Sequence, residues 1–509
     1  MTTTDSVQSI IRAANDRGDT ARHATSRFAC ALCVCVALVS SVPLAAVAQT
    51  KGAPLAGTRF NIDLVTGPIV GTNRAVGLGG AYTALGYGID TAVMNPAAYA
   101  VRTLWDTRWF EFDVALEYSP GALRNIDFIN SGKSSDTVSS DFLFVTLGGA
   151  LVLGDVGVGG IVRNQGYKIS TNAREGSTLG GAAKLSLVLA NYGACYAFLD
   201  GQLMIGLAAR TASVTFSSLN NAVLGEFANT GPEVGAILAV DELPYRVGFA
   251  MRTAVSTTND KVNESGLFTP PLAVVLPTEV QAGFAYQFGD RPLNRRFVNP
   301  HERERTLRNA LLVRRLNRQR TQARNEQAER LHTQTTTVSG TGPAWLAEPS
   351  DPTFWREEGK RMANEDAEFK VTLERAEQQH IQAIRDLSRN YVLVSADVIF
   401  IGATSNGIGL DSFLSQTRED SGRNPALAFR IGAEGEPIPN LLRLRLGTYL
   451  EPSRIDGIEP RLHGTIGCDV KLFEFDVFGL VPKFNYRVSL SLDLAARYRS
   501  VGFSVGIWH

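Results

Sequence analysis

The segment that decides the fold is Trp109–Tyr118, WFEFDVALEY, in which apolar and acidic residues alternate. Its even-numbered positions are all apolar, whereas three of its odd-numbered positions are the carboxylates Glu111, Asp113 and Glu117. Successive side chains of a β-strand point to opposite faces, so this pattern predicts a strand with one wholly apolar face and one acidic face. Such a strand suits a wall between an apolar medium and a polar interior.

The same alternation recurs farther along the chain, in segments 279–288, 442–451, 462–472 and 486–494. Most predicted strands have about ten residues, the length that crosses a bilayer at a tilt, whereas soluble strands usually have about five or six. Aromatic residues gather near segment ends, as in the interfacial girdles of membrane barrels: Trp105, Trp109, Tyr118, Tyr286, Phe288, Tyr449, Tyr486, Tyr498 and Trp508. A secreted β-sandwich also alternates, and it is the alternative.

Fourteen such segments can be counted, near 106–118, 141–154, 156–169, 178–199, 202–216, 233–243, 245–256, 275–288, 391–405, 424–436, 441–452, 461–474, 485–496 and 499–508. The sequence therefore predicts an all-β transmembrane barrel of about fourteen antiparallel strands. Strands 1–8 are expected in residues 105–290, and strands 9–14 in residues 391–509.

Residues 1–48 have the features of a cleaved signal peptide: a basic flank, an apolar run and an A-x-A cleavage site at Ala46–Ala48. An internal apolar helix is the alternative. After cleavage only Cys195 and Cys468 remain, which make neither a disulfide framework nor a paired metal motif. An exported chain with two-faced strands is expected in the outer membrane of a Gram-negative cell.

The 509-residue chain has 50 basic and 50 acidic residues, so its formal net charge of zero gives no support to a nucleic-acid partner. The histidines beyond the leader never show metal-ligand spacing, and no Ser/His/Asp arrangement is readable. We therefore expect no catalytic residue, no metal, no cofactor and no enzyme activity. An outer-membrane esterase or protease is the alternative.

Residues 49–104 are expected to form an N-terminal hatch that plugs the barrel, because about fourteen strands enclose more space than their own side chains fill. The run GGAYTALGYGIDTAVMNPAAYA, which starts at Gly79, consists mostly of small residues. Gly79 and Gly80 permit close approach of the backbone. Asp90 can cap a short helix, and Pro96 breaks the helix before it.

The longer run GTNRAVGLGGAYTALGYGIDTAVMNPAAYA (71–100) resembles the N-terminal signature of the FadL-type outer-membrane transport proteins, which pairs a G-GG-A segment with a D-A…NPA segment. The matching residues are Gly77, Gly79, Gly80, Ala81, Asp90, Ala92, Asn95, Pro96 and Ala97. ALAFRIGAEGEPIPNLLRLRLGTYL (426–450) is similar to the family's turn with glutamate, proline and asparagine. The resemblance covers roughly 55–290 and 390–509.

This resemblance implies a fourteen-stranded barrel closed by an N-terminal hatch, through which hydrophobic molecules enter the cell. It places Asn95, Pro96 and Ala97 in a hatch that rearranges when ligand is released. The alternative for these residues is that they only close a helix. Because the family also contains secretion and surface-anchoring members, the resemblance does not define a substrate.

Residues 291–390 depart from the barrel pattern and from the family resemblance, because they are charged and helical. The first arm holds far more Arg than Glu, a linker rich in Thr, Ser, Gly and Pro follows, and the second arm carries an apolar stripe. Since eight strands precede this insertion, it is expected on the periplasmic side. It is either a solvated helical hairpin or a docking arm for a periplasmic protein with an anionic surface.

The function expected first is passive uptake of a hydrophobic small molecule, such as a long-chain fatty acid, by a barrel surrounded by outer-membrane lipid. Charges expected in the lumen would bind an acyl carboxylate or pair with one another: Glu111, Asp113, Arg430, Arg443 and Arg445. The link 257–274 offers only Leu267, Phe268 and Leu272 as an apolar landing surface, which counts against fatty-acid transport. The alternative is a non-transporting anchor or envelope scaffold that recruits a periplasmic protein through 291–390.

Overall fold

The computed structural model describes residues 59–119, 127, 130–132, 143–171, 181–218, 223–258, 261–262, 269, 271–336, 352–414, 416–475 and 484–508, except 66, 70, 71 and 87, together with 53, 55 and 57. The expected signal peptide, 1–48, lies outside the described residues. Within this part of the chain, no helix has both the length and the apolar character needed to cross a membrane.

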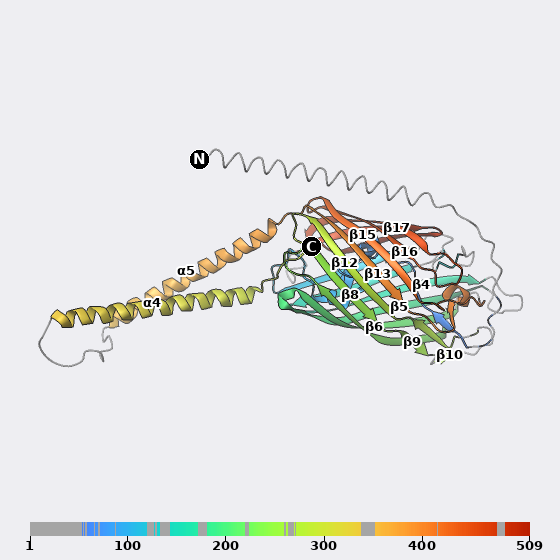
Figure 1. Ribbon diagram of the computed structural model, residues 1–509, viewed down its shortest axis with the longest axis horizontal. Coiled ribbons are helices and arrows are strands. Elements are labelled where there is room, and N and C mark those ends of the chain that lie inside the picture. Colours follow the sequence, from blue (N-terminus) through green and yellow to red (C-terminus); the bar gives the residue numbers. More distant parts are fainter. Residues whose placement is uncertain are drawn as a thin grey trace. The chain divides into compact units, whose positions relative to one another are not determined.

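The main sheet is a closed antiparallel barrel (Figure 1). Its order contains fifteen strands, but β10 (Lys261–Val262) is a two-residue extension that pairs only with β7, so fourteen strands form the wall. β7 also pairs with β8, which closes the cylinder. The wall strands are β2 (Phe110–Ser119), β3 (Leu143–Leu153), β4 (Val156–Thr171), β5 (Gly181–Phe198), β6 (Leu203–Ser218), β7 (Val223–Leu238), β8 (Tyr245–Arg252), β12 (Glu279–Gly289), β13 (Tyr391–Ile401), β15 (Ala426–Ile438), β16 (Leu442–Glu451), β17 (Arg461–Phe475), β18 (Phe484–Ala495) and β19 (Tyr498–Ile507). The predicted fourteen-stranded antiparallel barrel is confirmed.

The two faces of the strands divide as the alternation predicts. In β2, the acidic side chains of Glu111, Asp113 and Glu117 are buried inside the barrel, whereas Val114 and Leu116 are exposed on its outer surface. Large apolar side chains are exposed in the same way on other strands, among them Leu147, Val162, Leu207, Phe249, Phe284, Phe400, Phe429, Leu462, Leu490 and Phe503. A closed barrel with an apolar outer surface satisfies its backbone hydrogen bonds internally, which is the requirement for crossing a bilayer with strands.

Three aromatic residues expected in the interfacial girdles lie elsewhere. Tyr449 and Tyr498 are buried in the lumen with 2% and 3% exposure, and Trp508 is buried under the guanidinium of Arg443, 4.6 Å from the ring centroid. Tyr449 occupies the same strand face as Arg443, so its parity, rather than its place near a strand end, determines its environment. The expectation of a girdle position was wrong for these three residues.

A second, small sheet was not expected from the sequence. It has the order β14–β1–β11–β9, and its strands are β14 (Gly407–Gly409), β1 (Asn61–Asp63), β11 (Ala273–Leu276) and β9 (Val255–Thr258). β1 runs parallel to both of its neighbours. The N-terminal segment is therefore paired with two links that connect barrel strands, and α6 (Leu410–Leu414) follows β14 directly.

The two ends of the barrel differ in the length of their connections. At one end, which we call the short-turn end, strands are joined by residues 154–155, 199–202, 239–244 and 439–441, with the short η2 turn (Leu199–Gly201) among them. At the other, the loop end, residues 253–278 and 402–425 make longer links that contain the small sheet. β12 ends and β13 begins at the short-turn end.

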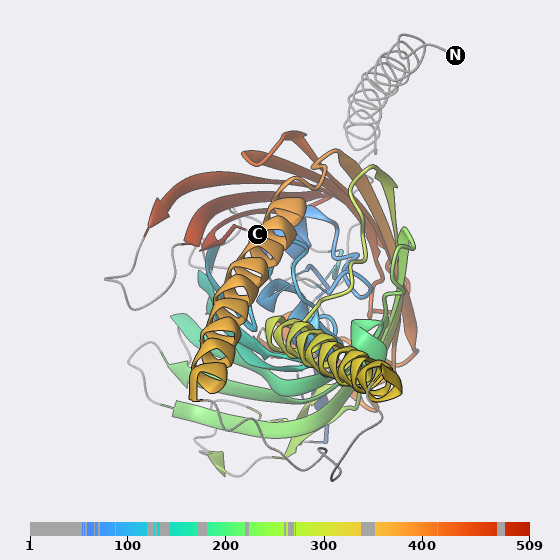
Figure 2. The ribbon, with the colours of Figure 1, turned by 90° about the vertical axis from the view of Figure 1, so that its left-hand side faces the viewer.

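The hatch lies inside the cylinder, as the blue segment of Figure 2 shows. It contains three short helices: α2 (Asn73–Gly77), α3 (Ile89–Ala92) and the 3-10 turn η1 (Pro96–Ala100). The Thr72 side chain caps α2 by accepting a hydrogen bond from Ala75 N. Almost all of the described residues from 72 to 104 are buried, so the hatch gains its stability from the wall around it.

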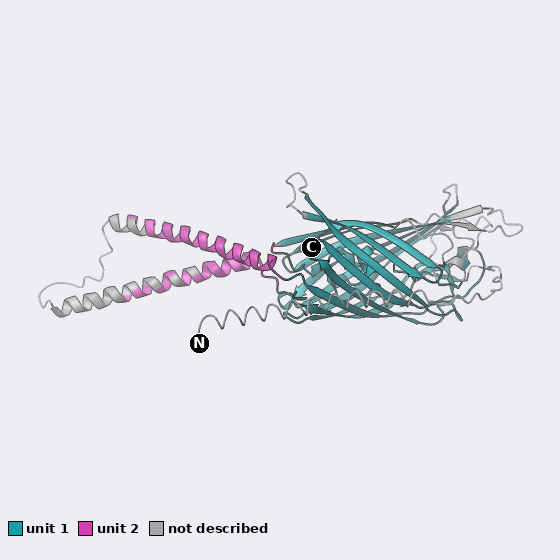
Figure 3. Cartoon of the chain, turned by 90° about the horizontal axis from the view of Figure 1, so that it is seen from above, with its two compact units in different colours: residues 1–106, 110–296, 388–509 teal, residues 107–109, 297–387 magenta. Residues whose placement is uncertain are grey.

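The inserted segment forms a second compact unit of residues 107–109 and 297–387, somewhat narrower than the expected 291–390 (Figure 3). It contains two long helices, α4 (Pro300–Thr336) and α5 (Pro352–Arg385). The two helices are joined by ion pairs, including Arg315 with Glu365 at 3.5 Å. In the apolar stripe of α5, Phe369, Leu373 and Ala376 are half-buried.

Candidate functional site

Glycines on the inner face of the barrel make room for the hatch. A Cβ atom added at one inward-facing glycine on each of ten strands would lie less than 3.0 Å from a hatch atom. These residues are Gly148, Gly157, Gly206, Gly235, Gly248, Gly283, Gly432, Gly447, Gly467 and Gly502. The wall and the hatch are therefore fitted to each other around most of the circumference.

Gly79 and Gly80 lie where the resemblance and the sequence both predicted a close approach. Their φ angles are +61° and +71°, in the left-handed region that favours glycine. A Cβ on Gly79 would lie 2.8 Å from Thr448 N in β16, and one on Gly80 would lie 2.6 Å from Ile69 Cδ1. Both positions thus require glycine for structural reasons, and their part in ligand passage stays a prediction.

The Asn95-Pro96-Ala97 segment joins the hatch to the wall. Asn95 Oδ1 accepts a hydrogen bond from Ala97 N at 3.0 Å and thereby caps η1, whose first residue is Pro96. Asn95 Nδ2 donates to Thr83 O at 2.9 Å within the hatch and to Ala236 O of β7 at 3.2 Å. Pro96 therefore follows α3 and is also the first residue of η1. A ligand role for the Asn95-Pro96-Ala97 segment stays a prediction.

Asp90 does not act as the expected helix cap. It is the second residue of α3, and its Oδ2 accepts a hydrogen bond from Arg487 Nη2 of β18 at 2.5 Å. Arg74 of α2 approaches the same carboxylate at 3.9 Å and Glu434 of β15 at 3.5 Å. Asp90 is thus a charged contact between hatch and wall, because its position inside the helix turns its side chain toward β18.

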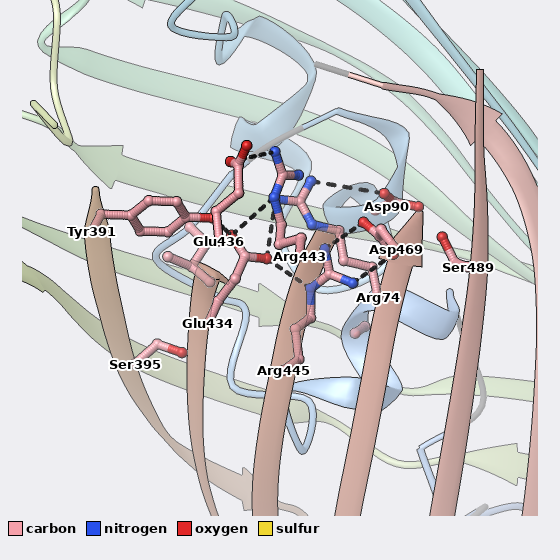
Figure 4. Close-up of polar contacts among 12 residues, drawn as sticks. Arg74, Asp90, Tyr391, Ser395, Glu434, Glu436, Arg443, Arg445, Asp469 and Ser489 are labelled. Atoms are coloured by element: carbon pink, nitrogen blue, oxygen red, sulfur yellow. Dashed lines mark hydrogen bonds and ion pairs between the residues drawn. The ribbon is translucent and has the colours of Figure 1, made fainter. Parts of the chain in front are cut away.

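Arg445 is the centre of the buried charge cluster that receives these hatch residues (Figure 4). Its Nε donates to Glu434 Oε2 at 2.7 Å, and its two Nη atoms donate to the two oxygens of Asp469 at 2.7 and 2.5 Å. Arg487 Nη1 also reaches Asp469, at 3.1 Å. Arg443 lies 3.9 Å from Glu434 and 3.7 Å from Glu436, at the edge of the cluster.

Glu111 and Asp113 bind the hatch rather than one another. Glu111 accepts hydrogen bonds from Thr103 N at 3.1 Å and from Thr103 Oγ1 at 2.6 Å. Asp113 accepts one from Ile89 N at 3.0 Å, at the start of α3. A carboxylate near a helix N-terminus is favourably placed against the free N–H groups.

Two further wall carboxylates hold the hatch backbone in the same manner. Glu117 accepts a hydrogen bond from Asn73 N at 2.8 Å, and Asp397 of β13 accepts from Tyr82 N and Thr83 N at 2.9 Å each. All three carboxylates of the WFEFDVALEY segment thus contact the hatch. Within the hatch, burial raises the pKa of the Tyr82 phenol, so it is neutral.

Arg430 also contacts the hatch, since its Nη1 lies 3.3 Å from Gly80 O and 3.7 Å from Met94 Sδ. The five lumen charges predicted from the sequence therefore all face the interior, but the structure places them in separate groups. Their partners include hatch residues and wall residues such as Glu434 and Asp469. Their proposed contact with a ligand carboxylate stays a prediction.

A second charged group lies farther toward the loop end, and we call it the arginine layer: Arg163, Arg210, Glu233, Arg252 and Glu279. Arg252 donates to Glu233 Oε1 at 2.6 Å and to Glu279 Oε2 at 3.1 Å, and Arg210 donates to Glu279 Oε1 at 3.1 Å. The layer has three arginines and two glutamates, a surplus of one positive charge. Arg210 Nη1 is buried without a hydrogen-bond partner among the described residues.

Beyond the arginine layer, the interior of the loop end contains a large apolar cluster. This cluster contains buried side chains from β5, β6, β7, the N-terminal segment and the long links, and we call it the loop-end core: Leu55, Phe60, Ile62, Leu64, Leu185, Leu187, Leu189, Ala212, Val214, Phe216, Phe227, Val255, Val274, Leu276, Ile408, Leu410, Phe413 and Tyr498. Phe413 of α6 lies at its centre, with ring centroids 4.8 Å from Phe216 and 6.2 Å from Phe60. The apolar surface expected at Leu267 and Phe268 lies outside the described residues.

The sequence analysis did not single out several of these site residues. Glu434, Asp469 and Asp397 occupy strand positions of inward parity, which was the available signal for them. The arginine layer could have been found in the same way, because Arg210 and Arg252 also lie at inward positions of their strands. The inward parity of the ten glycines was readable too, but their common contact with the hatch required the structure.

No group of three or more His, Cys, Asp or Glu residues that could hold a metal ion occurs in the described part of the chain. The free thiols of Cys195 and Cys468 are not bridged, and Cys195 is buried against the hatch, with Sγ 3.2 Å from Ala97 O. The polar groups of the described lumen are arranged to hold the hatch and to neutralise one another.

A closed barrel with an apolar exterior, a charged interior and an internal N-terminal hatch defines the class: a plugged β-barrel of the outer-membrane type. No family model matches the chain, and no curated protein sequence matches it. Among solved structures, it is similar to the Ralstonia pickettii toluene transporter TbuX, with 11% identity, a TM-score of 0.44 and coverage of 86% of this chain and 98% of that one. It is also similar to a Pseudomonas aeruginosa FadL homologue (10% identity, TM-score 0.42, 90% and 98% covered) and to the CymD monoaromatic hydrocarbon channel (9%, 0.43, 87% and 97%).

Proposed function

We propose that this barrel takes up hydrophobic small molecules that carry one carboxylate, of the long-chain fatty-acid type. The observation that supports this proposal is the order of the inward-facing residues along β6. Arg210 is followed on the same face by Ala212, Val214 and Phe216, so a cationic position leads directly into the loop-end core. Over six residues, a strand provides about 20 Å of such surface.

Each part of this arrangement matches one part of an acyl anion. The Arg210 Nη1 atom, which has no hydrogen-bond partner among the described residues, favours a carboxylate. The loop-end core favours a chain without polar groups, because apolar surface leaves water when it is buried there. For a ligand to enter, Phe413 and its neighbours would have to give way, since their side chains fill the core in this structure.

The hatch is proposed as the second barrier on the route. Ten wall glycines and at least four wall carboxylates contact it, so a ligand below the arginine layer requires rearrangement of the hatch. Asn95 is the proposed hinge contact, because its side chain bridges η1, Thr83 and the wall at Ala236. Pro96 and Ala97 would move with it.

The test is native mass spectrometry of the folded, detergent-purified barrel with a panel of fatty acids and of neutral toluene. The expected result is a stoichiometric fatty-acid adduct that Arg210→Ala weakens by about tenfold or more, in line with the loss of a charge-assisted hydrogen bond. Arg423→Ala is the matched control, because Arg423 is a loop-end arginine with a 66% exposed side chain. Retention of toluene with no fatty-acid adduct would replace the carboxylate proposal by one of neutral aromatic ligands, and an empty barrel would contradict both.

A second candidate function, an anchor that recruits a protein, is favoured by one feature of α4. From Arg305 to Arg324, this helix has seven arginines and no acidic residue. Three large apolar side chains in its middle, Leu312, Val313 and Leu316, are more than half exposed. An apolar centre with arginines around it is the composition of a protein-binding surface, and its partner would carry acidic groups.

We infer that this insertion is periplasmic, because β12 and β13 meet it at the short-turn end and short turns face the periplasm in outer-membrane barrels. Deleting residues 297–387 separates the two functions. A transporter keeps its uptake, whereas a scaffold loses a partner that can be cross-linked at Leu312 in the intact chain. Protease accessibility of α4 from outside intact cells would contradict the periplasmic assignment.

A further inference from the structure

His463 of β17 lies between two carboxylates in the loop-end half of the lumen. Its Nδ1 is 2.8 Å from Asp493 Oδ1 of β18, and its Nε2 is 2.7 Å from Glu451 Oε2 of β16. All three side chains have 1% exposure or less. The imidazole is therefore enclosed by its protein partners.

Ionised carboxylate oxygens accept hydrogen bonds and do not donate them. A neutral imidazole has only one N–H, so it would leave one of the two short N···O contacts without a hydrogen atom. Both contacts are satisfied when the ring carries a proton on each nitrogen. Because Arg461 also donates to Glu451 and Tyr449 also donates to Asp493, both carboxyl groups act as acceptors. The geometry therefore favours the imidazolium cation over a neutral ring beside a protonated carboxyl group.

With both carboxylates ionised, the imidazolium balances the charges of its nearest neighbours. Arg461 of β17 donates to Glu451 Oε2 at 2.8 Å, and Tyr449 of β16 donates its hydroxyl to Asp493 Oδ2 at 2.6 Å. Tyr498 of β19 lies on the other side, with its ring centroid 5.3 Å from that of His463. One arginine and one imidazolium then offset Glu451 and Asp493, whereas a neutral imidazole would add an unmatched negative charge to a buried region that already holds the Asp127 carboxylate.

The same group touches the hatch at two places. Ile69 N lies 3.4 Å from Tyr449 Oη, and the Tyr449 ring is stacked on His463 with centroids 4.1 Å apart. Gly67 lies so near the Glu451 carboxylate that an added Cβ would be 1.6 Å from Oε1. Glu451 and Tyr449, which both contact His463, are therefore also wall residues that contact the hatch segment 67–69.

We propose that His463 is a permanently charged positioning residue: a buried imidazolium that holds Glu451 and Asp493 in place and thereby seats the hatch segment 67–69 against β16. This role does not depend on which molecule the barrel carries. It requires only the contacts of β16, β17, β18 and β19 with one another and with the hatch.

The first measurement is nitrogen NMR of histidine-labelled full-length protein in lipid nanodiscs, with the His463 signal assigned by its absence from His463→Gln. At pH 8, where an ordinary histidine is neutral, both ring nitrogens of His463 are expected to carry protons. The exposed His301 of α4 serves as the internal reference for a neutral ring. A His463 signal with one bare nitrogen at pH 8 would overturn the proposal.

The second measurement is the rate at which a thiol reagent labels a cysteine placed at Ile69, which is buried in the intact protein. His463→Gln is expected to raise this rate at least about tenfold, because it leaves a buried carboxylate without its cation. The double variant His463→Gln/Asp493→Asn restores the charge balance, so its rate should return to within about threefold of the parent rate. His301→Gln is the matched control.

Two outcomes would contradict the positioning role. One is an unchanged labelling rate in His463→Gln, and the other is a double variant that is no better than the single one. If His463→Gln does not assemble, the His463 signal is identified as the one that remains when the other histidines are replaced, and Asp493→Asn alone still decides. His463 should then lose its second proton at pH 8, because only one carboxylate faces it.

Discussion

Gly79 shows at the scale of one residue how tightly the hatch is held. Its backbone has a positive φ, and the wall at Thr448 N occupies the space that a side chain would need. Either property alone favours glycine, and together they make the position intolerant of substitution.

We expect Gly79→Ala to lower the free energy of unfolding by about 2–4 kcal/mol, the sum of backbone strain and overpacking. Gly457→Ala is the control, since Gly457 also has a positive φ, +81°, but among the described residues no atom beyond its chain neighbours lies within 4 Å of its added Cβ. Urea unfolding of both variants in lipid vesicles measures the difference. Equal losses would mean that strain, and not contact with β16, decides the effect.

Arg445 is the residue whose loss should affect the wall most, because it lies between Glu434 and Asp469 with only 1% of its side chain exposed. Arg445→Leu leaves two buried carboxylates without their main cation and should cost about 3–5 kcal/mol of unfolding free energy. Arg423→Leu removes an arginine from an exposed ion pair and should cost less than about 1 kcal/mol. The same unfolding assay compares them, and similar values for the two variants would contradict the importance assigned to the buried cluster.

Parity along a strand predicted most of what the barrel elements do. It gave the lipid face and the lumen face of β2 and β16, and it assigned Glu111 and Arg445 to the interior before any contact was known. The prediction for Tyr449 was wrong because it used the residue's place near a strand end, which indicated a girdle, instead of its parity. Parity could not predict the partners of the lumen charges, because these partners lie on other strands and in the hatch.

On the outer face of β6, Leu207 is 66% exposed to what should be lipid. We expect Leu207→Arg to reduce the stability of the folded barrel by about 2–4 kcal/mol, since a charge on the lipid face is costly near the middle of the bilayer. Leu312→Arg on α4, at a residue with 53% exposure, should change stability by less than about 0.5 kcal/mol because that helix is solvated. Heat-modifiability on gels and unfolding in vesicles measure the effect of both variants. A small effect of Leu207→Arg would contradict a lipid environment for the outer face of β6.

For the whole molecule, the sequence indicated the strand number and the place of the insertion, but not the contacts that join distant segments. β1 pairs with residues 273–275 and 407–409, and neither pairing has a local signal in a three-residue strand. The hatch and wall likewise meet through residues hundreds of positions apart, such as Asp90 and Arg487. Contacts of this kind depend on how the barrel closes, and no local sequence pattern predicts that.

The insertion should be dispensable for folding of the barrel. β12 and β13 pair with each other from Glu279–Ile401 to Gly289–Tyr391, and Arg291 N still lies 3.4 Å from Asn390 O beyond the last pair. A variant in which a short glycine-rich link replaces residues 297–387 is therefore expected to form a heat-modifiable barrel in normal yield. Failure of this variant to fold would show that the insertion takes part in assembly.

The ring of wall glycines has a consequence for the order in which the molecule is assembled. A hatch that touches ten strands at distances too short for a methyl group could not slide into a finished cylinder. We therefore expect it to lie on the curling sheet before β7 meets β8, with the N-terminal segment as a template for the wall. Loss of this template would lower the yield of closed barrels before it changed what passes through them.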